Sequence, residues 1–256
     1  MAAPVALFVI VSAASFWNRV ANQRHKSLSD EKVRLKINSI EKRIQMDEGK
    51  RGIHELIPTF LPIDGNLSHL EGAARALLAS KNVIIMTGFP CLLKNNPPTE
   101  TDGPLGAICI ARTLLALNKN VRIITDECNE EVILSCVASS NIFSMNYVKK
   151  NPLALQLESF PGMSSFDSND YKRLNTIKEN VDMIIAIERA GPASDGLYKT
   201  MRGYDMTPIL APLDTLLQPT DFDDDVDLLF AGKQLNNSSS SSNNIVIDID
   251  TDYSGK

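Results

Sequence analysis

Three short apolar runs, separated by segments of helix length, constrain the fold of this chain more than any other feature. Residues 83–86 (VIIM), 121–125 (VRIIT) and 181–188 (VDMIIAIE) have the length and composition of buried strands. Strands that alternate with helices favour a parallel sheet with right-handed crossovers. The sequence therefore predicts an α/β fold with an open, mostly parallel sheet flanked by helices.

The segments around these strands predict the helices. Between residues 30 and 48, Val33, Ile37, Ile40 and Ile44 recur at steps of three and four, so we expect an amphipathic helix that packs on the domain through this apolar stripe. Further elements are expected as helices over residues 67–80, 106–118, 129–140 (with Asn129 as cap) and 170–180, and as a short strand around 154–157.

The composition divides the chain into one domain and two flanking segments. Residues 1–28 begin with an uncharged apolar run and then carry arginines, which indicates a targeting or flexible segment. A mitochondrial matrix location is the first expectation, with a membrane anchor or a cytoplasmic location as alternatives. A single α/β domain is expected over residues 30–217. Residues 218–256 are acidic and rich in Asn and Ser, which predicts a disordered tail, although residues 245–253 could add an edge strand.

Charge and metal-binding residue types exclude several classes of function. A net charge of −5 gives no electrostatic footprint for nucleic acid, so no nucleic-acid partner is expected. Four cysteines without a CxxC pair and three histidines offer no zinc-type spacing. No cofactor and no stable membrane association are expected. A divalent metal is not excluded, and the oligomeric state is open.

Candidate binding residues follow the predicted strands, because ligands of open parallel sheets bind where the carboxyl ends of strands meet helix N-termini. The segments after the three strands are polar or rich in glycine. They carry Thr87, Gly88 and Phe89 after the first, Asp126 and Glu127 after the second, and Glu188 and Arg189 after the third.

Two of these strand ends have alternative interpretations. Asp126 and Glu127 either bind a cation or a substrate amine, or simply begin the next helix. Glu188 and Arg189 either contact a ligand or form a structural salt bridge, because charged groups at the end of a buried strand need partners.

The loop over residues 97–107 places two hydroxyls and two carboxylates directly before Gly103 and a helix N-terminus. These groups could surround a ligand, or Thr101 or Asp102 could only cap the helix, and both can hold together. The polar residues of this loop are Thr99, Glu100, Thr101 and Asp102.

Residues 193–205 contain Asp195, Gly196, Tyr198 and Arg202. The guanidinium of Arg202 has the fork geometry that binds a carboxylate, although a solvated turn is the alternative.

Several blocks of sequence resemble the D-glutamate cyclase family over about residues 49–217. The blocks are RGI at 51–53, TGFP at 87–90, TETDGPLGA at 99–107, TDE at 125–127, AIERAGPASDGLY at 186–198, MRG at 201–203 and APLD at 211–214. The resemblance implies a lyase of D-glutamate metabolism that converts D-glutamate to 5-oxo-D-proline with loss of water, in mitochondria.

The chemistry that this resemblance implies requires a base, an acid and a group that stabilises an anion. Asp102 or Glu188 is the candidate base or amine anchor, and Arg202 or Arg189 the candidate carboxylate clamp. We expect backbone groups near Gly88 and Gly103 to donate to developing oxyanions.

The chain departs from the family pattern after residue 214. The family continues into a glycine-rich segment of the GDGGNEIG type, whereas here an aspartate run follows. The sheet and the site could therefore be incomplete at the C-terminal end. The alternative to an active cyclase is a catalytically inactive carboxylate-binding or regulatory paralogue, or a truncated product. A phosphate- or nucleotide-binding α/β domain is a third interpretation, without a P-loop pattern to support it.

Overall fold

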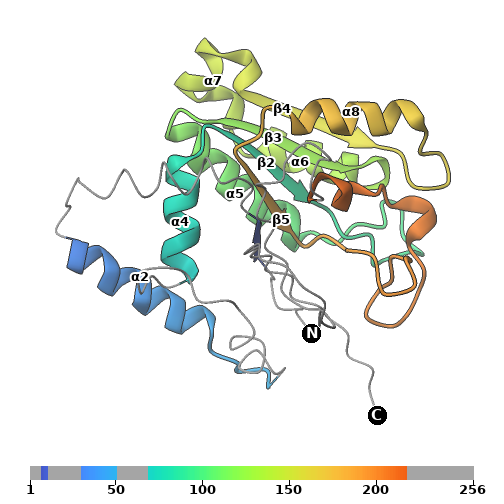
Figure 1. Ribbon diagram of the computed structural model, residues 1–256, viewed down its shortest axis with the longest axis horizontal. Coiled ribbons are helices and arrows are strands. Elements are labelled where there is room, and N and C mark those ends of the chain that lie inside the picture. Colours follow the sequence, from blue (N-terminus) through green and yellow to red (C-terminus); the bar gives the residue numbers. More distant parts are fainter. Residues whose placement is uncertain (1–6, 11–29, 51–68, 218–256) are drawn as a thin grey trace, which may run out of the picture.

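The computed structural model describes residues 7–10, 30–50 and 69–217 (Figure 1). Within these residues, five strands form one sheet in the order β1-β5-β2-β3-β4. The four strands of the parallel part are β2 (Asn82–Thr87), β3 (Asn120–Asp126), β4 (Leu155–Phe160) and β5 (Met183–Ile187). Strand β1 (Leu7–Ile10) pairs antiparallel with β5. The predicted open, mostly parallel α/β fold is confirmed.

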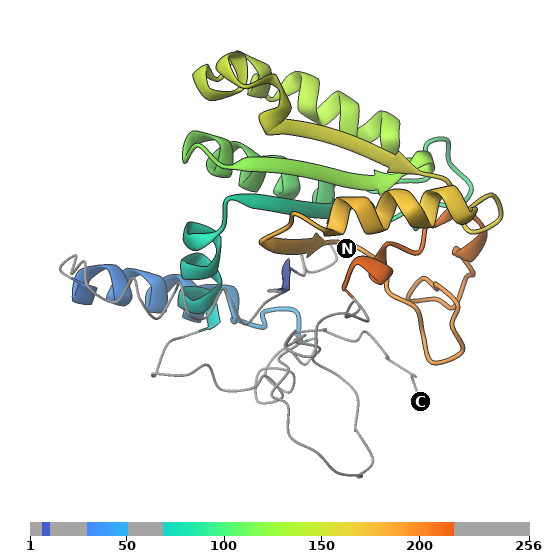
Figure 2. The same ribbon diagram turned by 45° about the horizontal axis from the view of Figure 1, so that its top comes forward.

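Helices cover both faces of the sheet (Figure 2). On one face lie α5 (Asp102–Ala116), α6 (Glu130–Ser139) and α7 (Asn146–Lys150), and on the other α8 (Ser168–Lys178) and the 3-10 helix η6 (Leu213–Leu217). Helices α2 (Asp30–Ile44) and α4 (His69–Ala79) precede the parallel strands. Four further 3-10 turns are η2 (Glu127–Asn129), η3 (Ile142–Ser144), η4 (Pro152–Ala154) and η5 (Thr207–Ile209).

Strand β2 shows why the apolar runs form a two-sided core. Its residues alternate between the faces, so that Val83 and Ile85 join the cluster that packs under α5, and Ile84 and Met86 join the cluster under α8. All four side chains are almost fully buried. A strand that buries both faces has no polar alternation, which explains the continuous apolar run.

The parallel register brings the ends of three strands to one edge of the sheet. Thr87 at the end of β2 pairs with Ile187, the last residue of β5, and Met86 pairs with Ile124 of β3. The carboxyl end of β3 is Asp126, and Glu188 directly follows β5. This edge is where a ligand site was predicted.

Helix α2 forms where it was predicted, but most of its apolar stripe does not form the contact surface. Val33, Ile40 and Ile44 are 38%, 54% and 59% exposed. Polar groups meet α4: Arg34 pairs with Glu71 at 3.2 Å, and a Glu41 carboxylate oxygen accepts a hydrogen bond from the Leu70 N–H. Ile37, the fourth residue of the stripe, lies between Arg34 and Glu41 on the same helix face and is half-buried. The helix therefore packs on α4, but mainly through an ion pair and a cap at the start of α4, and the predicted contact surface is wrong for three of its four residues.

One strand and one α-helix of the described residues were not predicted. Strand β1 comes from the segment interpreted as a targeting or flexible sequence, and α7 lies in a stretch with weak helix signals. The flanking predictions for residues 1–6, 11–29 and 218–256, the edge strand over 245–253 and the RGI block lie outside the described residues. None of the helices in the described ranges is long and apolar enough to cross a bilayer.

Candidate functional site

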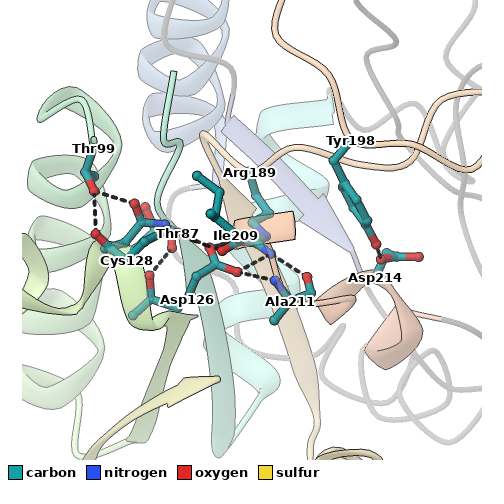
Figure 3. Close-up of polar contacts among 11 residues, drawn as sticks. Thr87, Thr99, Asp126, Cys128, Arg189, Tyr198, Ile209, Ala211 and Asp214 are labelled. Atoms are coloured by element: carbon teal, nitrogen blue, oxygen red, sulfur yellow. Dashed lines mark hydrogen bonds and ion pairs between the residues drawn. The ribbon is translucent and has the colours of Figure 1, made fainter. Parts of the chain in front are cut away.

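The carboxyl edge of the sheet holds two groups of polar residues with different bonding. We call the first the ion-pair network (Asp126, Arg189, Asn129, Thr99 and the backbone of Ala211). The second is the Thr87 cluster (Thr87, Asp102, Gly103 and Glu188). Figure 3 shows that Asp126, Arg189 and Ala211 point toward one another, with Thr87 close by.

Asp126 lies at the centre of the ion-pair network and is fully buried. Both of its carboxylate oxygens accept from the Arg189 guanidinium, with Nη2 at 2.9 Å from Oδ1. The Ala211 N–H donates to Oδ1 at 2.6 Å, and the Asn129 amide donates to Oδ2 at 2.8 Å. The carboxylate is therefore fully used by protein donors.

Arg189 bonds to Ala211 as well as to Asp126. Its side chain is 4% exposed, and its Nη2 also donates to the Ala211 carbonyl at 2.7 Å. Burial alone would lower the pKa of Arg189, but the Asp126 carboxylate beside it raises this pKa, so the guanidinium stays charged. The salt bridge considered for the third strand end thus exists, with Asp126 as the partner. A substrate-binding role for either residue stays a prediction.

Asn129 joins the ion-pair network to the loop before α5. It occupies the predicted cap position of α6, but its side chain makes no cap hydrogen bond. Its amide oxygen instead accepts from the Thr99 hydroxyl, because the Asp126 carboxylate attracts the amide N–H and turns the side chain inward. Gly88 is required here: its φ is +112°, and a Cβ would lie 2.6 Å from Asn129 Nδ2.

The segment after β5 is fixed over the same edge. The buried Tyr198 hydroxyl donates to the Asp214 carboxylate, and burial together with Asp214 raises the pKa of this phenol. Phe89 packs against the cluster of Tyr198, Met206 and Leu210. The segment is thus bonded to β3 at Ala211, and the Tyr198–Asp214 hydrogen bond joins two of its own parts.

Other predicted residues make no hydrogen bond or ion pair with these two groups in the described part of the chain. Asp195 pairs with Lys199, which lowers the pKa of the Asp195 carboxyl, and both Asp195 and Gly196 are exposed. Arg202 is exposed in a turn and makes no hydrogen bond or ion pair with another residue of the described ranges. Glu127 and Thr101 are also exposed.

Glu100 lies between the two groups, in the loop that joins them. Its carboxylate accepts from the Cys91 thiol at 3.1 Å. Burial raises the pKa of Glu100, and the neighbouring Asp102 charge adds to this effect. Burial and the Glu100 carboxylate raise the pKa of Cys91 to about 12, so this thiol stays protonated.

The residues of the Thr87 cluster are packed closely, but one hydroxyl in it has no hydrogen bond. Thr87 is fully buried, and its hydroxyl has no hydrogen-bond partner, which holds for no other buried side-chain polar atom in the described residues. A Cβ on Gly103 would lie 2.5 Å from the Glu188 Cβ and 3.2 Å from the Thr87 Oγ1. The end of β2, the end of β5 and the first turn of α5 therefore meet at Gly103.

The backbone around the Thr87 cluster is unusual at two positions. Glu188 has a φ of +47°, a left-handed conformation that is unfavourable for a residue with a side chain. Thr101 occupies the N-cap position of α5 but makes no side-chain cap hydrogen bond, and the Asp102 carboxylate accepts from the Gly103 N–H at 3.2 Å. Thr101 thus lies at the predicted N-cap position, but its hydroxyl does not make a capping hydrogen bond.

No group of three or more His, Cys, Asp or Glu side chains within residues 30–50 and 69–217 is placed to hold a metal ion. The sequence interpretation also missed two features of the ion-pair network, the Ala211 backbone and the bridging role of Asn129, and it missed the Asp214 partner of Tyr198. Asp214 lay in a quoted sequence block, and Asn129 follows Asp126 by one helical turn, which were the available signals.

The fold and this edge define an α/β domain with a candidate small-ligand site at the carboxyl ends of its parallel strands. A family profile described as "D-glutamate cyclase-like, C-terminal" matches residues 40–229. The chain belongs to this family, as the sequence blocks predicted. It is 29% identical to human "D-glutamate cyclase, mitochondrial" over 196 residues, which cover 75% of this chain. The match spans 29% of the length of that relative.

Proposed function

We propose that this chain is a D-glutamate cyclase-like lyase that converts D-glutamate to 5-oxo-D-proline and water. Family membership supports the reaction class, and the name of the human relative supports the substrate. The observation that carries the proposal is the convergence of Thr87, Glu188 and the first turn of α5 at Gly103. Two carboxylates, Asp102 and Glu188, belong to this one cluster.

The chemistry sets clear demands on such a cluster. The amine nitrogen of D-glutamate attacks the carbon of the side-chain carboxylate, a C–N bond forms, and a C–O bond breaks. Two protons leave the ammonium group, and both end on the departing oxygen, which leaves as water. The net reaction neither consumes nor releases protons. One carboxylate that accepts a proton and later donates it therefore meets the need for both base and acid.

Glu188 is the proposed proton carrier, and Asp102 the proposed anchor of the ammonium group. The left-handed backbone of Glu188 is a strain that folds retain when it places a functional side chain. Asp102 stands in the first turn of α5, where its carboxylate is a candidate partner for the ammonium group. Arg202, exposed and without a protein partner in the described residues, is the candidate clamp for the second carboxylate.

The test is the formation of 5-oxoproline from D-glutamate by the purified full-length chain. We expect Glu188→Gln to lower kcat by roughly 10²–10⁴-fold, the usual contribution of a general acid–base group. Asp102→Asn should raise KM more than it lowers kcat. Glu131→Gln, an exposed carboxylate in the first turn of α6, is the matched control. Wild-type protein without turnover would reject the proposed reaction, and unchanged turnover in Glu188→Gln would remove Glu188 from the mechanism.

A second candidate is a carboxylate-binding module without catalysis. The hydrogen bonds of Arg189 to Asp126 and Ala211 favour this candidate. A guanidinium that is bonded to these protein groups is not available to bind a carboxylate of the substrate. Titration with D-glutamate by calorimetry separates the two candidates. Binding without formation of 5-oxoproline supports the module, and turnover rejects it.

The proposed location is the mitochondrion, which rests on the name of the human relative. Expression of the full chain with a C-terminal tag, followed by fractionation and protease protection, tests it. Recovery of the tag outside mitochondria would reject the location without affecting the proposed reaction.

A further inference from the structure

Two buried threonines at the same edge of the sheet differ in one respect. Thr87 ends β2, Thr125 lies near the end of the neighbouring β3, and both are fully buried. The Thr125 hydroxyl donates to the Thr87 carbonyl at 2.8 Å. The Thr87 hydroxyl has no partner. A buried polar group without a hydrogen bond is unfavourable. The Thr87 hydroxyl is therefore a candidate donor to a bound ligand.

The Thr87 hydroxyl lies beside a helix terminus that suits an anion. Helix α5 spans 15 residues, and the Thr101 side chain at its N-cap makes no cap hydrogen bond. Within the first turn, the Gly103 N–H donates to the Asp102 carboxylate at 3.2 Å. Gly103, in this first turn, has its missing Cβ position 3.2 Å from the Thr87 Oγ1. A hydroxyl donor and the positive end of a helix dipole thus face the same point.

Glu188 covers this point in the observed conformation. Its Cβ and Cγ lie 2.5 Å and 3.1 Å from the missing Cβ position of Gly103, while the side chain itself is half-buried. Rotation about the Glu188 Cα–Cβ bond leaves the Cβ in place but moves the Cγ and the carboxylate, and a ligand oxygen would reach the Thr87 hydroxyl from the side that they vacate. Ligand entry and the position of the proposed proton carrier are therefore coupled.

We infer that Thr87 and the first turn of α5 form a subsite for one carboxylate of the ligand, with the Thr87 hydroxyl as donor and Glu188 as the group displaced on entry. This inference rests on the proposed function for the identity of the ligand, a small dicarboxylate amino acid.

The experiment compares Thr87→Val with Thr125→Val in the full-length chain. Both changes replace a hydroxyl by a methyl group of the same shape at adjacent strand ends. Binding is measured by calorimetry with D-glutamate and with glutarate, which has both carboxylates but no amine. We expect Thr87→Val to weaken binding of both probes roughly 10-fold, the loss of one charge-assisted hydrogen bond, and Thr125→Val to leave it unchanged.

Thermal unfolding gives a second readout, in which Thr125→Val rather than Thr87→Val should show the larger loss. Thr87→Val should keep or raise Tm, because it removes an unpaired buried hydroxyl, whereas Thr125→Val should lower Tm through loss of its hydrogen bond. Thr87→Ser, which keeps the hydroxyl, should bind like wild type. Thr87→Val that lowers Tm and binds both probes normally would overturn the subsite. Failure of the wild type to bind either probe would also overturn it.

The outcomes separate this inference from the proposed reaction. If the wild type binds glutarate, Thr87→Val binds it more weakly, and no 5-oxoproline forms, the subsite stands and the reaction falls. If D-glutamate is turned over with the same KM by wild type and Thr87→Val, the reaction stands and the subsite falls. With both correct, KM rises roughly 10-fold in Thr87→Val while kcat changes little.

Discussion

The ion-pair network and the Thr87 cluster occupy the same edge of the sheet but differ in how completely their polar groups are bonded. Asp126 receives four hydrogen bonds from three partners, Arg189, Asn129 and Ala211. In the Thr87 cluster, one hydroxyl has no partner and one residue has a left-handed backbone. Buried groups that are fully paired hold a fold together, whereas unpaired or strained groups persist where a ligand completes them.

The difference assigns separate tasks to residues that a sequence motif presents as equal. Arg189 and Glu188 are neighbours in the chain, yet the first belongs to the ion-pair network and the second to the Thr87 cluster. The ion-pair network connects β3, the segment after β5 and the loop before α5. The same loop carries Asp102. The ion-pair network therefore supports the geometry of the Thr87 cluster without contacting the ligand in our proposal.

The largest expected effect comes from breaking the ion-pair network. Asp126→Ala leaves the Arg189 guanidinium buried without its counter-ion, and we expect the free energy of unfolding to fall by about 3–5 kcal/mol. Urea denaturation at pH 7 measures the loss. The exposed neighbour Glu127→Ala, as the control, should change stability by less than about 0.5 kcal/mol.

Replacement of both charges sharpens the same test. Asp126→Leu combined with Arg189→Met removes the uncompensated charge, so this double variant should recover much of the stability that Asp126→Ala loses. A loss below about 1 kcal/mol in Asp126→Ala would contradict the structural role assigned to the pair.

The second effect distinguishes two glycines of α5. A Cβ at Gly103 would lie 2.5 Å from the Glu188 Cβ, so Gly103→Ala should lower the free energy of unfolding by about 1–3 kcal/mol through overpacking. At Gly106 the nearest atom would be the Ile187 Cγ2 at 3.7 Å, an ordinary contact. Gly106→Ala should therefore gain about 0.5–1 kcal/mol from helix propensity.

Urea denaturation of both glycine variants measures stability, and titration with glutarate measures the subsite. Gly103→Ala should bind glutarate more weakly, while Gly106→Ala should bind it like wild type. Equal stability of the two variants would show that the first turn of α5 is not as tightly packed against Glu188 as the distances indicate.

The sequence was sufficient for the parallel strands because burial on both faces leaves a local signature in each run. The three predicted buried strands correspond to β2, β3 and β5, and their ends carry the candidate residues. It was not sufficient for β1, whose apolar residues resemble a targeting segment, or for the contact side of α2. A stripe of apolar residues predicts a buried face, but ion pairs at other positions of a helix can make the contact instead.

The pairing within the site could not be predicted for a different reason. Arg189 lies 63 residues from Asp126 in the chain, and Ala211 lies 85 residues from it. No local pattern in the sequence indicates whether Asp126 or Glu127 pairs with the Arg189 guanidinium. The sequence interpretation left a ligand and a salt bridge open for Arg189, and only the register of β3, β2 and β5 places Asp126 within reach.

The smallest expected effect concerns Glu100, which lies in the loop between the two groups. Burial raises its pKa above the ordinary 4.5, with a further contribution from Asp102, while the hydrogen bond from the Cys91 thiol opposes the shift. The folded protein thus holds this proton more tightly than the unfolded chain. Ionisation of Glu100 costs stability: the cost is absent below pH 4.5, grows as pH rises, and is complete above the folded pKa.

Glu100→Gln removes this cost, so it should match wild type at pH 4 and exceed it at pH 7, by less than about 1 kcal/mol because the carboxylate is partly screened by solvent. Urea denaturation at pH 4, 5, 6 and 7 measures the difference. Cys91→Ala, which removes the thiol donor, should raise the pKa of Glu100 further and steepen the wild-type loss of stability with pH. A difference between Glu100→Gln and wild type that stays constant with pH would assign the effect to packing. Glu100 would then belong with the fully bonded groups of the ion-pair network rather than with the strained groups of the Thr87 cluster.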